Sequence, residues 1–164
     1  MDALTIVVCA LIVIGTFLFW EFVAWFTHKY VMHGFLWVWH QSHHTVHDHI
    51  LEKNDWFAVV FSIPSIVLIY FGTVWMYNPY LISVGIGIFC YGLFYLVFHD
   101  IVVHQRIRWK PNKRSHYLQR MIHAHYIHHS KQTKHGCEAF GFLIAPKKFE
   151  PKYFSYKLER KETQ

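Results

Sequence analysis

Charged residues are scarce in this chain of 164 residues, and those present are unevenly placed. They make up 16% of the sequence, against 54% hydrophobic and 20% aromatic residues, and no Lys or Arg precedes Lys29. The apolar residues are gathered into blocks, which is typical of a membrane protein and not of a soluble domain of this length. The length allows one domain with one core, which we place at residues 1–164.

Several motifs of soluble proteins are also absent. The three cysteines have no CxxC spacing, which argues against a disulfide framework and against an iron–sulfur cluster. The sequence has no GxGxxG motif for a flavin or nicotinamide cofactor, so no cofactor-binding residues of that kind are predicted. The net charge of +6 is not arranged as a basic stripe with interleaved aromatic residues, so nucleic acid is not an expected partner.

Three apolar blocks are long enough to cross a membrane, namely residues 4–26, 56–77 and 80–98. Each holds about 20 residues, which as a helix span about 30 Å of hydrocarbon. Asn78-Pro79 predicts a tight turn, so the second and third blocks should form a hairpin. The first block is too long for a cleaved signal peptide and follows an acidic residue, so we expect a retained helix. The fold class predicted is an all-α integral membrane protein: a helical bundle with about three spanning helices, room for a fourth partial one, and a histidine-rich helical cap.

The distribution of positive charge predicts the orientation of these helices. All 16 Lys and Arg residues lie after the first block, just before the second, or after the third. Three spans place these segments on one side of the membrane, and the positive-inside rule makes that side cytoplasmic. We therefore expect the N-terminus outside, and the C-terminus and the cap in the cytoplasm.

The 15 histidines all lie outside the apolar blocks, and one pair of patterns occurs twice among them. An H-x4-H motif follows the first block, at 28–33, and the third, at 99–104. An H-x2-H-H motif follows each of these, at 40–44 and 125–129. Positions i, i+3 and i+4 share a helix face, so each H-x2-H-H should direct three imidazoles into one volume. Positions i and i+5 diverge by about 140° on a regular helix, so each H-x4-H requires a helix end or a local bulge.

This density of imidazoles predicts a metal centre suited to iron, zinc or copper. Ten motif histidines exceed what one ion coordinates, so we predict two ions; a structural zinc site would need only four ligands. A membrane metal-binding or transport protein would instead carry polar groups near the membrane midplane, and only Glu21 approaches that depth. The motifs directly follow the spans, which places the centre at the cytoplasmic membrane surface. A lipid entering from the hydrocarbon is then the favoured substrate.

These motifs resemble those of the fatty acid hydroxylase superfamily, and within it those of bacterial enzymes that hydroxylate carotenoid rings. The resemblance extends from about residue 4 to residue 146, and its segments are HKYVMH (28–33), WHQSHH (39–44), NDWFAVVF (54–61), YGLFYLVFHDIVVHQR (91–106), AHYIHH (124–129) and GCEAFGFLIAP (136–146). It implies a non-haem di-iron monooxygenase that acts at C3 and then C3′ of β-ionone rings, converting β-carotene to β-cryptoxanthin and then zeaxanthin. It also implies the bacterial inner membrane, O2 as co-substrate and electrons from a separate donor such as ferredoxin with its reductase. Another membrane lipid hydroxylase or a desaturase is the alternative activity.

Carried over position by position, the resemblance implies ten iron ligands, which are the motif histidines His28, His33, His40, His43, His44, His99, His104, His125, His128 and His129. No catalytic residue beyond these ligands is predicted. Five histidines lie outside the motifs and are expected to be surface or loop residues: His47, His49, His116, His123 and His135.

Four other features are assigned from the residues themselves. Glu21 lies seven positions before His28 on the same helix face, and Asp100 directly follows His99. Either carboxylate is a candidate to accept a hydrogen bond from the second ring nitrogen of a ligand, which would fix its tautomer. The alternatives are that Glu21 reaches out to the membrane interface and that Asp100 caps a helix or forms a salt bridge. Contact with lipid headgroups is expected for the basic residues Arg106 and Arg108 and for the basic segment 147–161.

Overall fold

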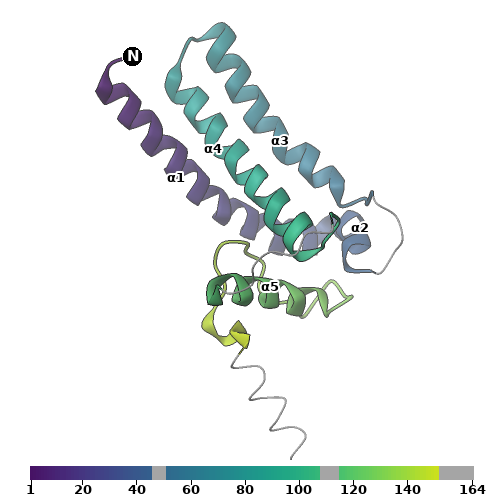
Figure 1. The fold of residues 1–164 in the computed structure, drawn as a ribbon. Coiled ribbons are helices and arrows are strands. Elements are labelled where there is room, and N and C mark those ends of the chain that lie inside the picture. The colour runs from purple at the N-terminus through teal and green to yellow at the C-terminus, as the bar shows by residue number, and fades with distance from the viewer. Residues whose placement is uncertain (46–50, 108–114, 152–164) are drawn as a thin grey trace, which may run out of the picture.

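The computed structural model describes residues 1–45, 51–107 and 115–151, and every regular element in these ranges is a helix. Three long helices stand side by side: α1 (Ala3–Thr27), α3 (Asp55–Tyr70) and α4 (Pro79–Tyr95). In Figure 1 they form the upper part of the molecule, with α4 between the other two. The predicted all-α fold class is confirmed.

Each long helix continues into a π-helical segment. These segments are η1 (His28–Phe35) after α1, η3 (Phe71–Trp75) after α3 and η4 (Leu96–Val103) after α4. With these extensions, Ala3–Phe35, Asp55–Trp75 and Pro79–Val103 are long and apolar enough to cross a membrane. The three predicted spans are therefore present, and no fourth span occurs within the described ranges. The chain is a membrane protein.

Small residues allow α4 to approach both neighbours closely. A Cβ atom on Gly87 would lie 2.6 Å from Thr16 Cβ on α1 and 2.8 Å from the carbonyl oxygen of Val13. On the other side of α4, the hydroxyl of Ser65 on α3 donates a hydrogen bond of 2.8 Å to the Gly85 carbonyl oxygen. Close backbone contact of this kind is how helices associate in lipid, where burial of apolar surface gives no advantage.

The predicted turn between the second and third spans is present. Asn78 lies just before α4, and its side-chain oxygen accepts from the N–H groups of Tyr80 and Leu81 at 2.9 and 3.3 Å. Pro79 is the first residue of the helix, where its missing N–H costs nothing. The two helices therefore form the expected hairpin.

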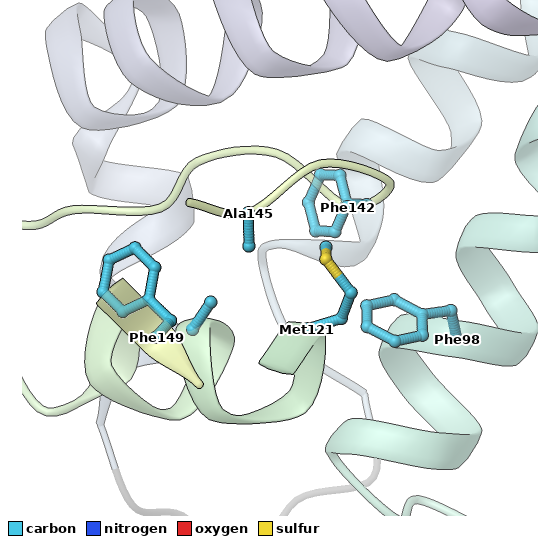
Figure 2. Packing of buried hydrophobic residues seen from close by; sticks show 6 residues of the cluster. Phe98, Met121, Phe142, Ala145 and Phe149 are labelled. Carbon is cyan, nitrogen blue, oxygen red and sulfur yellow. The ribbon is translucent and has the colours of Figure 1, made fainter. Parts of the chain in front are cut away.

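The remaining elements form a cap at one end of the bundle. They are α2 (Trp37–His40), η2 (Gln41–His44), α5 (His116–His129) and η5 (Lys147–Phe149). Figure 1 shows α5 lying across the ends of the long helices. A buried apolar cluster fastens this cap (Figure 2); its members are Phe98, Met121, Ala124, Phe142, Ala145 and Phe149. Met121 is 1% exposed, so α5 is held firmly to the extension of α4 and to the segment that follows α5.

Candidate metal centre

The first H-x4-H motif lies within the π-helical segment η1, and the second begins within η4 and ends at His104, the residue that directly follows η4. The turn at 99–104 is closed by a bond of 2.9 Å from the His104 N–H to the His99 carbonyl oxygen, which is the i to i+5 pattern of a π-helix. A wider turn brings positions i and i+5 onto one face, so the two histidines of each motif point the same way. The local bulge expected from the spacing is confirmed at both motifs. At the first one, Gly34 departs from helical geometry, with φ −104° and ψ −123°.

The structure brings all ten motif histidines together in two groups of five, and within each group the available ring nitrogens lie within 4.8 Å of one another. The first group consists of His28, His33, His40, His44 and His128. The second group consists of His43, His99, His104, His125 and His129. The groups adjoin, since the rings of His44 and His129 stack with centroids 4.4 Å apart.

Each group draws four histidines from one half of the chain and one from the other half. The first and last histidines of each H-x2-H-H motif join the H-x4-H pair of their own half, whereas the middle ones, His43 and His128, cross to the opposite group. Helical geometry separates the middle histidine of each motif from the other two. Positions i and i+4 are only about 40° apart around a helix, whereas i+3 lies on the other side of i by about 60°. The expectation that each motif serves one place is therefore corrected: each motif straddles the boundary between two groups.

In the first group, every histidine has its Nδ1 atom held by an oxygen acceptor. The acceptors are the carbonyl oxygens of Phe140 for His28, Lys134 for His33, Lys131 for His44 and Glu138 for His128, and the side-chain oxygen of Asn54 for His40, at 2.7 to 3.1 Å. A carbonyl oxygen only accepts, so Nδ1 must carry the proton. Nε2 then presents a lone pair to the interior of the group, which is the tautomer a metal ion requires.

The second group uses carboxylates instead of backbone carbonyls. His43 donates through Nδ1 to Glu52 at 3.0 Å, and His99 donates to Asp100 at 2.6 Å. The Nδ1 atom of His125 and the Nε2 atom of His129 are buried and have no hydrogen-bond partner among the described residues. A carboxylate partner makes an imidazole a more basic ligand, so the two groups differ in electronic character.

The spacing of the facing nitrogens tests whether the groups fit a metal ion. His33 Nε2 and His128 Nε2 are 3.1 Å apart, and both rings donate their Nδ1 proton elsewhere. Two lone pairs therefore face each other and cannot form a hydrogen bond. In the second group, His43 Nε2 and His99 Nε2 are 2.9 Å apart. Two nitrogen ligands at right angles around one ion, each about 2.1 Å from it, are separated by about 3.0 Å. Both groups fit a transition-metal ion.

Burial keeps these imidazoles neutral. It lowers the pKa of His40 to about 3, although the hydrogen bond to Asn54 acts in the opposite direction. It also lowers the pKa of His44 and of His104 to about 4. A histidine must be deprotonated to bind a metal ion, so these groups are ready for binding at neutral pH.

A cavity of about 290 Å³ opens onto the second group. Four of its lining residues belong to that group and one, His44, to the first. The rest of the lining mixes apolar and polar side chains: Thr45, Val103, Ile122, Tyr126 and Gln132. The second group is therefore the more accessible of the two among the described residues.

Comparison with known proteins identifies the family. The family model described as fatty acid hydroxylase matches residues 13–146. The chain belongs to the fatty acid hydroxylase family.

Several relatives in this family carry a named activity. A protein from Paracoccus sp. (strain N81106 / MBIC 01143), named beta-carotene hydroxylase, is 43% identical over 137 residues, which cover 83% of each chain. One of the same name from Pantoea ananas is 46% identical, over 84% of this chain and 77% of the relative. The beta-carotene 3-hydroxylase 2 of Arabidopsis thaliana chloroplasts is 34% identical, over 79% of this chain and 43% of the relative. No solved structure shows a significant match.

In this hydroxylase-family chain the two predicted carboxylates have different partners. Asp100 makes the expected contact with a ligand ring, that of His99. For Glu21 the expectation is wrong: its oxygens accept from the hydroxyl of Tyr91 and from the backbone N–H groups of Phe142 and Leu143, not from a histidine ring. The second nitrogen of the His28 ring is already engaged by a carbonyl, which leaves no role for Glu21 there.

The lipid contact expected for Arg106 is also corrected. Its guanidinium forms ion pairs with Glu52 at 2.8 Å and with Asp55 at 2.9 Å. Glu52 in turn accepts from His43, so Arg106 supports a histidine of the second group indirectly, through Glu52. Arg108 and residues 152–161 of the basic segment lie outside the described residues.

None of the remaining histidines belongs to either group among the described residues. His123 donates through Nδ1 to the Phe149 carbonyl oxygen at 2.9 Å, while His116 and His135 are exposed. His47 and His49 lie outside the described residues. Sequence reasoning missed Glu52 and Asn54, because both lie in a loop whose residues have no periodicity to relate them to a histidine.

Proposed function

We propose that this membrane protein is a carotenoid ring hydroxylase that inserts an oxygen atom from O2 at C3 and C3′ of β-ionone rings. β-Carotene would give β-cryptoxanthin and then zeaxanthin. In each round a ring C–H becomes C–OH, while two electrons and two protons convert the second oxygen atom to water. The observation that carries the proposal is the pair of five-histidine groups in a chain whose relatives, over most of its length, are named beta-carotene hydroxylases.

Two iron ions are the proposed metals, one in each group. Bound iron would supply the activation of O2, which this reaction needs and which no side chain provides. The residues of the chain would hold the ions and keep the ligand rings oriented. Ten neutral nitrogens give the ligands, the Nδ1 bonds fix the direction of seven of these rings, and all five histidines of the first group are buried. Imidazole ligands are compatible with iron.

The site is proposed to lie at the cytoplasmic surface of the bacterial inner membrane. In support, the H-x4-H motifs are the last turns of two helices suited to spanning a membrane, so the ligands begin where the apolar sequence ends. The clustering of Lys and Arg on that side supports the orientation. A carotenoid dissolved in the hydrocarbon would reach such a site by one end, which suits attack on a terminal ring. Ferredoxin with its reductase is the proposed source of electrons.

Expression in a bacterial host that accumulates β-carotene tests this function. The wild-type chain should yield β-cryptoxanthin and zeaxanthin, measured by chromatography of the extracted pigments. His125→Ala should abolish both products while the protein still reaches the membrane. His135→Ala is the matched control, because that side chain is exposed and belongs to neither group, and it should retain activity. Unchanged β-carotene with well-expressed wild type would refute the substrate. Purified protein that holds zinc at full occupancy, without iron, would refute the mechanism.

A further inference from the structure

A short segment after α5, residues 138–143, contacts the first histidine group. The carbonyl oxygen of Phe140 accepts from His28, and that of Glu138 accepts from His128, both at 2.9 Å. The Phe142 ring stacks on His28 with centroids 5.6 Å apart and an angle of 8° between the planes. The orientation of two ligands in this group therefore depends on where the segment lies.

The segment does not hold this position by its own regular structure. It contains no helix or strand, and Ala139 has φ 59°, a left-handed conformation that residues with a side chain rarely adopt. Phe142 is buried against Met121 and Phe98, as Figure 2 shows, which fixes one side of the segment. Contacts from outside the segment must fix its backbone.

Glu21 provides the backbone contacts. This residue is in α1 and is only 7% exposed. Its Oε1 atom accepts from the N–H groups of Phe142 and Leu143, each at 2.9 Å, and its Oε2 atom accepts from the hydroxyl of Tyr91 on α4 at 2.6 Å. One carboxylate thus joins the segment to two spanning helices. Charge-assisted bonds of this kind are stronger than those between neutral groups.

Gly141 shows how closely the segment fits against this carboxylate. A Cβ atom at this position would lie 2.7 Å from Glu21 Oε1 and 3.2 Å from the carbonyl oxygen of Ile144. Any larger residue would force either the Glu21 carboxylate or the segment to shift, which would disturb the hydrogen bonds between them. The contact therefore depends on both partners, which gives two independent ways to disturb it.

We propose that Glu21 is a positioning residue for the first histidine group. It fixes the segment 138–143, and through the carbonyl oxygens of Phe140 and Glu138 it fixes the rings of His28 and His128. This inference rests on the proposed function in one respect, that the groups bind metal ions. Through Nδ1 acceptors the effect of Glu21 is directed at the first group, because His43 and His99 in the second group use Glu52 and Asp100 as acceptors instead. The segment touches the second group only through the Phe142 ring, whose centroid lies 5.6 Å from that of His99 and 5.9 Å from that of His125.

Metal titration of the purified full-length chain in detergent tests this inference without reference to turnover. Cobalt(II) is the probe, with its stoichiometry and affinity measured in competition with a chelator. Wild type should bind two equivalents. Glu21→Ala should bind one equivalent as wild type does and the other about 10- to 100-fold more weakly, the usual loss when a ligand loses its orienting partner. Glu21→Gln should recover most of that loss, because its amide oxygen can still accept from both backbone N–H groups.

Double variants assign the weakened site. Glu21→Ala should add little to His128→Ala, which already lacks a first-group ligand, but should weaken the one remaining site of His125→Ala. Ser65→Ala is the matched control, since it removes a buried hydrogen bond between α3 and α4 that has no connection to the segment. It should bind both equivalents with wild-type affinity.

Gly141→Ala keeps the test decisive if Glu21→Ala does not fold, because this position lies outside the helices. It should reproduce the selective loss. Wild-type affinity for both equivalents in Glu21→Ala or Gly141→Ala overturns the inference, as does equal weakening of both sites with unchanged helicity. Wild type that binds no metal overturns the proposed metal centre as well. If wild type binds two equivalents with the expected pattern but leaves β-carotene unchanged, only the proposed reaction is refuted.

Discussion

His125 and His128 lie one turn apart on α5 and belong to one motif, yet they fall in different groups. His28 lies 100 positions before His128 and shares its group. Paired replacements should reveal this division in the metal content of the protein. His28→Ala with His128→Ala removes two nitrogens from one group and leaves the other complete. His125→Ala with His128→Ala removes one nitrogen from each.

The size of the effect follows from the binding free energy that each ligand contributes. A structural zinc site with four protein ligands binds with about 10–16 kcal/mol, or about 2.5–4 kcal/mol for each ligand. Loss of one nitrogen should weaken binding by about 100- to 1000-fold. At a metal concentration just sufficient for the wild-type sites, a group that lacks one ligand should therefore be almost empty. The double variant at His28 and His128 should retain about one equivalent of metal, and the double variant at His125 and His128 should retain almost none.

Elemental analysis of the detergent-purified variants, after equilibration with limiting iron or cobalt, measures these contents. Helicity by circular dichroism serves as the control for folding, and His135→Ala serves as the control for loss of a histidine outside the groups. In the reverse pattern, the double variant at His125 and His128 would hold about one equivalent of metal and the double variant at His28 and His128 none. That result would show that each motif serves its own ion. Loss of both ions in every single variant would refute independent groups.

Three further predictions concern separate parts of the molecule. Asp100→Ala should weaken metal binding in the second group by about 10- to 100-fold, since His99 loses its acceptor, and an unchanged affinity in the same titration would contradict this. Gly87→Ala should lower the free energy of unfolding by about 1–3 kcal/mol, because its Cβ would collide with α1; Gly15→Ala, with no neighbour within 4 Å, is the control in thermal unfolding, and equal midpoints would be evidence against close packing. The pKa of His44 and of His104 is about 4 in the folded chain, against 6.5 as the ordinary value. The unfolded chain therefore binds more protons between these values, so the metal-free protein should lose stability as the pH falls from about 6.5 towards about 4. Denaturant unfolding across that range should show it, and greater stability at the acid end would contradict it.

Local patterns were sufficient to predict the fold and the identity of the clustered histidines. Hydropathy identifies a spanning helix from its own residues, and the H-x4-H spacing indicates a bulge because i and i+5 cannot share a face of an α-helix. The π-turn at 28–33 is the physical form of that bulge. Such features depend on neighbours along the chain, so no knowledge of packing is needed to infer them.

Features that depend on packing between distant segments could not be predicted in this way. The crossing of His43 and His128 requires the relative placement of η2 and α5, which no spacing within either motif contains. The acceptor of His28 is the backbone carbonyl of Phe140, and every residue has such a group, so the sequence carries no signal for it. Arg106 is adjacent to a span, where headgroup contact is the ordinary expectation. Its partners are Glu52 and Asp55, and Glu52 lies 54 positions earlier in the chain, so no local pattern relates them to Arg106.

The exchange of the middle histidines also has a consequence for biogenesis. During synthesis the first half of the chain emerges with four ligands of one group, and its fifth ligand, His128, arrives only near the end. Each ion would therefore connect an early segment to a late one, and the free energy of metal binding would contribute to docking the cap. In iron-starved cells we expect newly made chains to reach the membrane with a loosely docked C-terminal half, and to be degraded faster than chains made when iron is available.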